Sequence, residues 1–143
     1  MDVLRKNTDY ALRAMVYLAK TADNAPSSTK LIAQSEDISY QLACKLMQKL
    51  TAAGLVQSEM GPKGGFTLAV SADKISLGDV IKAIQGSVCL NACLVGSFVC
   101  RRKEQCPVHS KLIDLQNQLD GYLNNITIAE LAKDNSKKKG TKK

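Results

Sequence analysis

Hydrophobic positions recur at helical spacing through the first third of the chain. Residues 7–20 place apolar side chains on one face and charged side chains on the other, which predicts an amphipathic helix capped by Asn7 or Thr8. Residues 28–37 repeat the pattern over a shorter span, with Ser28 as the N-cap. The side chains expected to face inward are Tyr10, Ala11, Ala14, Met15, Leu18, Ala19, Leu31, Ile32 and Ala33.

A third helical pattern and a hairpin follow. Residues 38–56 predict a helix that is capped by Ser39 and ends at Gly54, a favoured place for glycine. Two short β-type runs, 55–59 and 66–70, flank a turn rich in Pro and Gly and predict an antiparallel hairpin. The inward stripe of this helix is Ala43, Leu46, Met47 and Leu50. The order of these elements predicts a mainly α fold with a winged helix-turn-helix.

A short fourth helix is predicted over residues 76–86. Ser76 and Asp79 have the spacing of a capping box, in which two side chains satisfy each other's backbone N–H groups. Gly86 is expected to end this helix.

A long last helix is predicted from Pro107, which suits a first helical turn, to about Asn124. It carries a heptad-like apolar stripe that is too long for one small domain to bury, which predicts a partner helix and therefore a homodimer. The stripe consists of Leu112, Leu115, Leu119, Tyr122 and Ile126. A short terminal helix is expected to begin at Thr127.

These patterns divide the chain into four parts. They are a winged helix-turn-helix DNA-binding region (1–86), a cysteine-rich loop (87–106), the dimerisation helix with the short terminal helix (107–132) and a disordered lysine-rich tail (133–143). The tail holds six Lys and one Asp, so it contributes most of the net charge of +7. Contact with DNA must therefore depend on the local arrangement of polar and basic side chains rather than on bulk charge.

Composition narrows the classes of function. Apolar residues make up 45% of the chain, enough for a core, and no apolar run has the length of a membrane span. Five cysteines without a secretory signal pattern favour a reducing, cytoplasmic location. No nucleophile, base and acid are grouped as in an active site, so we expect a protein that is not an enzyme.

The third helix is the expected DNA-reading element, because the second helix of a helix-turn-helix pair enters the major groove. Its outward face is polar, with glutamines that suit adenine or phosphate and lysines that suit phosphate or guanine. The hairpin turn is placed for phosphate or minor-groove contact. The predicted DNA-binding residues are Ser39, Tyr40, Gln41, Cys44, Lys45, Gln48, Lys49, Pro62, Lys63 and Gly64.

The segment 89–109 holds four of the five cysteines and the only histidine. Their spacing is C-x3-C-x6-C-x5-C-x2-H, over Cys89, Cys93, Cys100, Cys106 and His109. Thiolates and imidazoles are soft or borderline ligands that suit iron–sulfur clusters and zinc. The spacing lacks the C-x2-C pairs of small zinc modules, but zinc remains one alternative to a cluster, and a reversible disulfide between free thiols is another.

Four motifs, in this order, resemble the IscR/NsrR-type (Rrf-type) family of winged-helix transcriptional regulators. They are TDYALRAMVYLA (8–19), GLVQSEMGPKGGFTL (54–68), SLGDVIKAIQG (76–86) and CPVHSKLIDLQNQLDGYLNNITIAELA (106–132). Together they leave little outside the resemblance except the lysine-rich tail. The resemblance implies a homodimeric repressor in which the cysteine loop holds an iron–sulfur cluster that senses redox state, nitric oxide, iron or cluster status. A cluster-free branch of the family responds to a partner enzyme.

The resemblance also implies the ligands of the cluster. For a [2Fe–2S] cluster, the favoured form, they are Cys93, Cys100, Cys106 and His109. In a [4Fe–4S] form, three cysteines are completed by Asp9 of the partner subunit, and in either form Cys89 is a spare. Two departures predict an operator that differs from the IscR one. Met60 stands where IscR-like members carry a groove-reading arginine, and Cys44 stands where they carry a selectivity glutamate.

The sequence therefore predicts a sequence-specific DNA-binding regulator whose operator binding depends on an iron–sulfur cluster. One alternative is a cluster-free regulator of the same fold that uses thiols or zinc. Another is a small electron-transfer iron–sulfur protein, which the helix-turn-helix and its wing argue against. A salt-dependent mobility shift on promoter DNA separates a regulator from an electron carrier.

Overall fold

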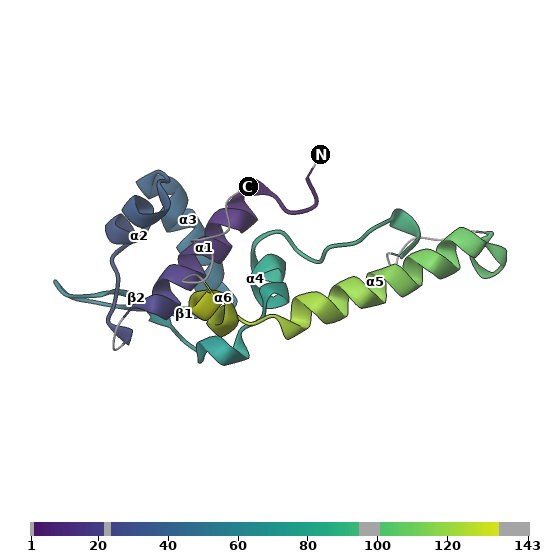
Figure 1. Cartoon of the computed structure of the whole chain (residues 1–143). Helices are drawn as coiled ribbons and strands as arrows, with labels where there is room; N and C mark the ends of the chain where they lie inside the picture. The colour runs from purple at the N-terminus through teal and green to yellow at the C-terminus, as the bar shows by residue number, and fades with distance from the viewer. Residues whose placement is uncertain (1, 22–23, 95–100, 135–143) are drawn as a thin grey trace, which may run out of the picture.

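Six α-helices and one two-stranded sheet make up the described part of the chain, which in this computed structural model covers residues 2–21, 24–94 and 101–134. The helices are α1 (Lys6–Lys20), α2 (Thr29–Glu36), α3 (Tyr40–Ala52), α4 (Leu77–Ile84), α5 (Pro107–Asn125) and α6 (Ile128–Asp134). The strands are β1 (Val56–Glu59) and β2 (Gly65–Leu68), and the 3-10 turns are η2 (Ala72–Lys74), η3 (Ala92–Leu94) and η4 (Lys103–Gln105). The mainly helical fold and the hairpin after α3 confirm the sequence prediction (Figure 1).

Side-chain caps fix the starts of three helices where the sequence predicts them. Ser28 and Ser39 each accept a hydrogen bond, at 3.1 Å, from the backbone N–H three residues further on. Ser76 and Asp79 form the predicted capping box, with reciprocal bonds of 3.0 and 3.1 Å. Because each cap satisfies backbone N–H groups that a helix leaves unpaired, these starts are encoded locally.

The start of α1 differs from the prediction. The helix begins at Lys6 after Arg5, which provides no side-chain cap, so capping by Asn7 or Thr8 is wrong. Instead the Gln85 side chain accepts hydrogen bonds from the Arg5 N–H at 2.9 Å and from the Thr8 hydroxyl at 2.6 Å. Thr8 is therefore buried within the helix, and its partner lies at the end of α4.

The hydrophobic core lies where α1, α3, α4 and α6 meet, with the base of the hairpin closing one side. The predicted inward stripe of α3 is buried in full. Leu31 of α2, also expected to face inward, is 49% exposed, because α2 directs Ile32 and Ala33 into the protein instead. The buried core residues are Ala11, Ala14, Met15, Leu18, Ile32, Leu46, Met47, Leu50, Val56, Ile75, Val80 and Ile128.

The helix α5 extends away from this core and is followed by a return of the chain into it (Figure 1). The N–H of Ile128, the first residue of α6, donates to the carbonyl of Ile75 at 2.8 Å, and the Ile128 side chain is fully buried. The N–H of Leu77 donates to the carbonyl of Ile126 at 2.9 Å. At the same junction a Cβ on Gly78 would lie 2.4 Å from the Asn124 Oδ1, so glycine permits the close approach of α4 to the end of α5.

Candidate functional site

The outward face of α3 is open to solvent, as the sequence predicts. Tyr40 is 60% exposed, and Cys44, one turn later, is half-buried. The other predicted DNA-binding residues of this helix and its cap are all exposed: Ser39, Gln41, Lys45, Gln48 and Lys49. With the opposite stripe in the core, α3 presents a polar surface of amide, hydroxyl and ammonium groups, the chemistry that base edges and phosphates accept.

Tyr40 and Cys44 interact on this face. A hydrogen bond with the Cys44 side chain raises the pKa of Tyr40 above its ordinary value of 10.0, and the Coulombic effect of Cys44 acts in the same direction. The Tyr40 hydroxyl is a hydrogen-bond donor on the surface that faces away from the core.

Lys49 is exposed but also makes a contact within the protein. Its Nζ donates to the carbonyl of Ile84 at 3.5 Å, where the C-terminus of α4 favours a positive charge. The end of α3 is therefore joined to the end of α4 by this hydrogen bond. Lys45, one turn earlier, makes no such contact within the described part of the chain.

The hairpin turn forms the wing beside this surface. Pro62 and Lys63 are exposed and Gly64 is half-buried, while Met60 is 94% exposed. The base of the wing is tied to the turn before α2, because Ser27 and Phe66 exchange backbone hydrogen bonds of 2.8 and 3.0 Å. The wing is thus held to the helix-turn-helix rather than attached only through the chain.

Three of the four predicted cluster ligands lie around one cavity at the start of α5. The cavity measures about 250 Å³, and Cys93, Cys106 and His109 line it together with Lys103. The Cys93 Sγ lies 3.3 Å from the His109 Nδ1. Cys106 is the N-cap of α5, and its Sγ accepts from the His109 N–H at 3.4 Å. Since a helix N-terminus favours negative charge, this position suits a thiolate.

The donor set is soft, but the described residues do not complete a metal site. Cys100, the fourth predicted ligand, lies outside the described residues. Among the residues that are described, no group of three or more His, Cys, Asp or Glu side chains could hold a metal ion. The chemistry of two thiols and an imidazole at one cavity nevertheless fits an iron–sulfur cluster, since thiolates and histidine are its known ligands.

Asp9, the alternative ligand, and Cys89, the spare cysteine, do not line this cavity. Asp9 is on α1, where its carboxylate pairs with Arg13 at 3.4 Å. Arg13 also binds Glu36 at 3.1 Å and stacks over the Tyr10 ring. Cys89 is exposed, and its thiol donates to the Asn91 carbonyl at 3.2 Å.

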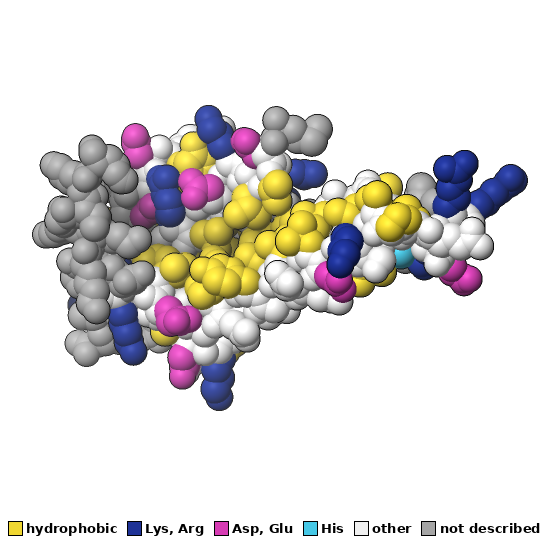
Figure 2. All heavy atoms as spheres, turned by 45° about the vertical axis from the view of Figure 1, so that its right-hand side comes forward, with side chains coloured by type: hydrophobic (Ala, Val, Ile, Leu, Met, Phe, Trp, Pro, Cys, Tyr) yellow, Lys and Arg dark blue, Asp and Glu magenta, His cyan; other side chains and the backbone are white. Residues whose placement is uncertain are grey.

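The predicted dimerisation stripe is largely uncovered. Leu115 and Tyr122 are 51% and 65% exposed, and Val108, one turn before Leu112, is 61% exposed. Leu112, Leu119 and Ile126 are half-buried. Val108 was missed by the sequence analysis, although its helical spacing from Leu112 could have placed it on the stripe. Figure 2 shows hydrophobic side chains continuing in one band from the core region onto α5.

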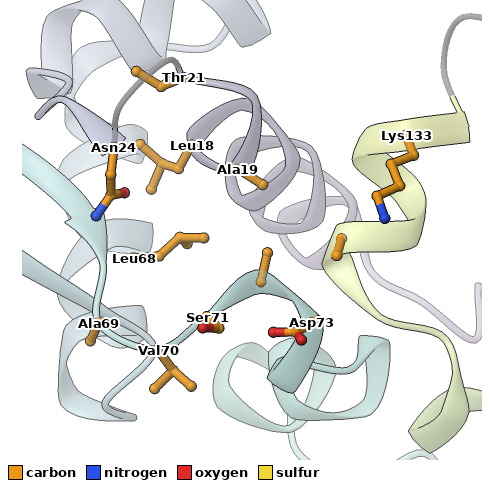
Figure 3. Close-up of a pocket in the computed structure, with 12 residues that line it drawn as sticks. Leu18, Ala19, Thr21, Asn24, Leu68, Ala69, Val70, Ser71, Asp73 and Lys133 are labelled. Carbon is orange, nitrogen blue, oxygen red and sulfur yellow. The ribbon is translucent and has the colours of Figure 1, made fainter.

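A larger cavity than the one at the start of α5 lies elsewhere. It measures about 600 Å³ between the end of α1, the end of β2, η2 and α6. Its charged lining residues, Asp73 and Lys133, stand on η2 and α6 (Figure 3). None of the predicted DNA-binding, dimerisation or cluster residues lines it.

Comparison with known proteins identifies the family. The family model Rrf2, described as an iron-dependent transcriptional regulator, matches residues 4–134. The HTH-type transcriptional regulator IscR of Vibrio campbellii is 37% identical over 126 residues, which is 88% of this chain and 74% of that protein.

In the part of the chain that the structure covers, no helix is both long and apolar enough to cross a membrane.

Solved structures agree in fold. CymR, the global cysteine regulator of B. subtilis, superimposes with a TM-score of 0.75 at 28% identity, covering 93% of this chain and 98% of that one. IscR of T. potens gives a TM-score of 0.73 at 27% identity, covering 97% and 92%. The family model spans nearly the whole chain, and the relatives and solved structures agree with it. The chain therefore belongs to the Rrf2 family of winged-helix transcriptional regulators.

Proposed function

We propose that this chain is a homodimeric repressor whose affinity for its operator is controlled by an iron–sulfur cluster bound at the start of α5. The observation that carries the proposal is the meeting of Cys93, Cys106 and His109 at one cavity, with 3.3 Å between the Cys93 Sγ and the His109 Nδ1. The iron dependence named for the family and the IscR relatives support it.

DNA reading is assigned to α3 and the wing. The exposed glutamines of α3 would contact base edges, while Lys45 and Lys63 would neutralise phosphates on either side of the groove. The uncovered side chains of the stripe on α5 support the proposed dimer, because pairing two such helices would remove the exposed Leu115 and Tyr122 from water. A two-fold dimer reads two half-sites at a fixed spacing.

The cluster would be held by Cys93, Cys100, Cys106 and His109 in its [2Fe–2S] form. When bound, it would supply a centre that redox change, nitric oxide or iron shortage can alter or remove. Cys106 would present its thiolate from the N-cap of α5, and Cys93 would come from the linker after α4, so the ligand set spans both elements. For a [4Fe–4S] form, Asp9 of the partner subunit would have to leave its pairing with Arg13.

The proposal is tested by anaerobic isolation and reconstitution with iron and sulfide. The reconstituted protein is expected to be coloured and to contain both elements. Its affinity for DNA that it selects from a randomised double-stranded library is expected to differ from that of metal-free protein. A change of about 5–150-fold is the usual range of such coupling. A colourless protein with unchanged affinity would contradict the proposal.

A cluster-free thiol regulator is the second candidate. The 3.3 Å contact between the Cys93 thiol and the His109 imidazole favours it, because a histidine beside a thiol assists thiolate chemistry. The structural likeness to CymR, a cysteine regulator, favours it too. In the same experiment this candidate predicts no bound iron or sulfide, together with DNA affinity that responds to thiol oxidants and recovers with a reductant.

Lys45→Ala tests the reading surface directly. Loss of one phosphate contact is expected to weaken binding of selected DNA to a similar degree across sequences, and to reduce the slope of log affinity against log salt by about 1. Fluorescence anisotropy over a salt series measures both. The matched control is Lys82→Ala, since Lys82 is an exposed lysine of α4 that lines a cavity against α5. If the slope of log affinity against log salt is the same for the two variants, Lys45 does not contact the DNA.

A further inference from the structure

The linker between α4 and the cysteine cavity is fastened to α5 by one side chain. The Gln116 Nε2 donates to the Val88 carbonyl at 2.8 Å, and the Gln116 Oε1 accepts from the Leu90 N–H at 2.9 Å. The same Nε2 donates to the Asp120 Oδ1 at 2.9 Å, which orients the amide. Within the described residues, the only other hydrogen-bonding contact between residues 87–94 and α5 is the one between Cys93 and His109.

Gln116 is well matched to this position. Its amide has two donors and one acceptor group, and three hydrogen bonds use them on backbone and carboxylate partners. It stands seven residues after His109, which is two turns, or about 10.5 Å, along the same helix. The linker is therefore attached to α5 at two positions, His109 and Gln116, which lie two helical turns apart.

The other end of the linker is joined to the DNA-reading domain. Gln85 binds the segment before α1 through the Arg5 N–H and the Val3 carbonyl, the latter at 3.0 Å, and it binds the first turn of α1 through the Thr8 hydroxyl. Ile84 accepts the bond from Lys49 at the end of α3. Ile84 and Gln85 therefore connect the recognition helix α3 with the start of α1. The linker begins just after them, at Gly86, which has a φ of 92°.

We infer that Gln116 is a positioning residue that fixes how the DNA-reading domain is held on α5, and so sets the spacing of half-sites that the dimer accepts. The inference rests on the proposed function, because it requires a dimer formed through α5. With Gln116 in place, the path from Gly86 to Leu90 has a fixed length along α5. Without it, the described part of the linker keeps only the contact between Cys93 and His109, and α5 is held to the DNA-reading domain mainly through Ile126 and Ile128. The separation of the two recognition helices is then fixed less tightly.

The experiment compares Gln116→Leu with Gln118→Leu. Leucine has a similar size and no hydrogen-bonding group, and Gln118 is an exposed glutamine of α5 that forms no side-chain hydrogen bond in the described residues. The probes are the DNA selected by the wild-type protein and two derivatives with one base pair added or removed between the half-sites. One base pair shifts a half-site by about 3.4 Å along and about 35° around the duplex.

Wild type and Gln118→Leu are expected to discriminate against the altered spacings by about tenfold or more, and Gln116→Leu by about twofold. Hydrogen exchange at the Leu90 amide in metal-free protein is expected to be about tenfold faster in Gln116→Leu alone. The melting temperatures of both variants separate a loss of spacing preference from a loss of stability.

Two results with the Gln116→Leu variant overturn the inference. In one, Leu90 exchange is as slow in Gln116→Leu as in wild type, so the contact does not hold the linker in solution. In the other, exchange accelerates but the spacing preference is unchanged. Failure of cluster control appears separately, as equal DNA affinity of reconstituted and metal-free wild type. A wild type indifferent to spacing would overturn both the inference and the proposed dimeric reader.

Discussion

Cys106→Ser is expected to abolish retention of iron and sulfide by reconstituted protein while leaving the fold intact. Serine keeps the capping interaction, because its hydroxyl can accept from the His109 N–H as the Cys106 Sγ does at 3.4 Å. It removes the thiolate that the proposed cluster requires. The loss should exceed tenfold, since changes even to groups that only support a ligand cost about 10–100-fold in metal affinity.

Iron, zinc and sulfide analysis with absorbance spectra measures this outcome, and circular dichroism verifies the helix content. Cys89→Ser is the matched control. Cys89 is exposed, and within the described residues its thiol bonds only to the Asn91 carbonyl, so the Cys89→Ser protein should retain the cluster. If both variants keep equal iron and sulfide, Cys106 is not a ligand. Zinc without sulfide in wild type would instead favour a zinc site.

Leu115→Asp is expected to convert the proposed dimer to a monomer. Leu115 is 51% exposed in the single chain and lies in the middle of the apolar stripe of α5, so pairing would bury an unpaired carboxylate from each subunit. A monomer engages one half-site at a time. Because linking two binding modules raises overall affinity by about 10²–10⁴, operator affinity should fall by about that factor.

Analytical ultracentrifugation at micromolar concentration and anisotropy with a two-half-site probe measure the two effects. Asn117→Asp supplies the control, since it adds the same charge two residues further on, about 200° around the helix from Leu115. This variant should remain dimeric. A Leu115→Asp protein that sediments as a dimer would show that the subunits associate through another surface.

Local signals in the sequence were sufficient to predict most of the fold. The starts of α2, α3 and α4 were predicted because serine caps act within three residues of themselves. The core face of α3 was predicted because helical periodicity depends only on neighbouring residues.

Two features that the sequence did not reveal, the start of α1 and the contacts of Gln116, depend on residues far apart. The start of α1 is set by Gln85, which lies 80 residues from Arg5. Gln116, 26 residues from Leu90, resembles any polar residue on an exposed helix when it is viewed in sequence. The candidate site shows the same division: the spacing of the cysteines predicted soft ligands close together in the sequence, whereas the cavity that Cys93 and His109 line requires the linker to lie along α5.

The return of the chain into the core after α5 has a mechanical consequence. The helix is joined to the DNA-reading domain twice, through the linker from α4 and through Ile126 and Ile128 at its own end. A rod attached by two segments cannot swing freely as it could on a single tether. Rotation of α5 about its long axis would instead apply torque to α4 and α6 together. In the proposed dimer, a small twist between the two subunits would therefore turn each α3 as part of a rigid body.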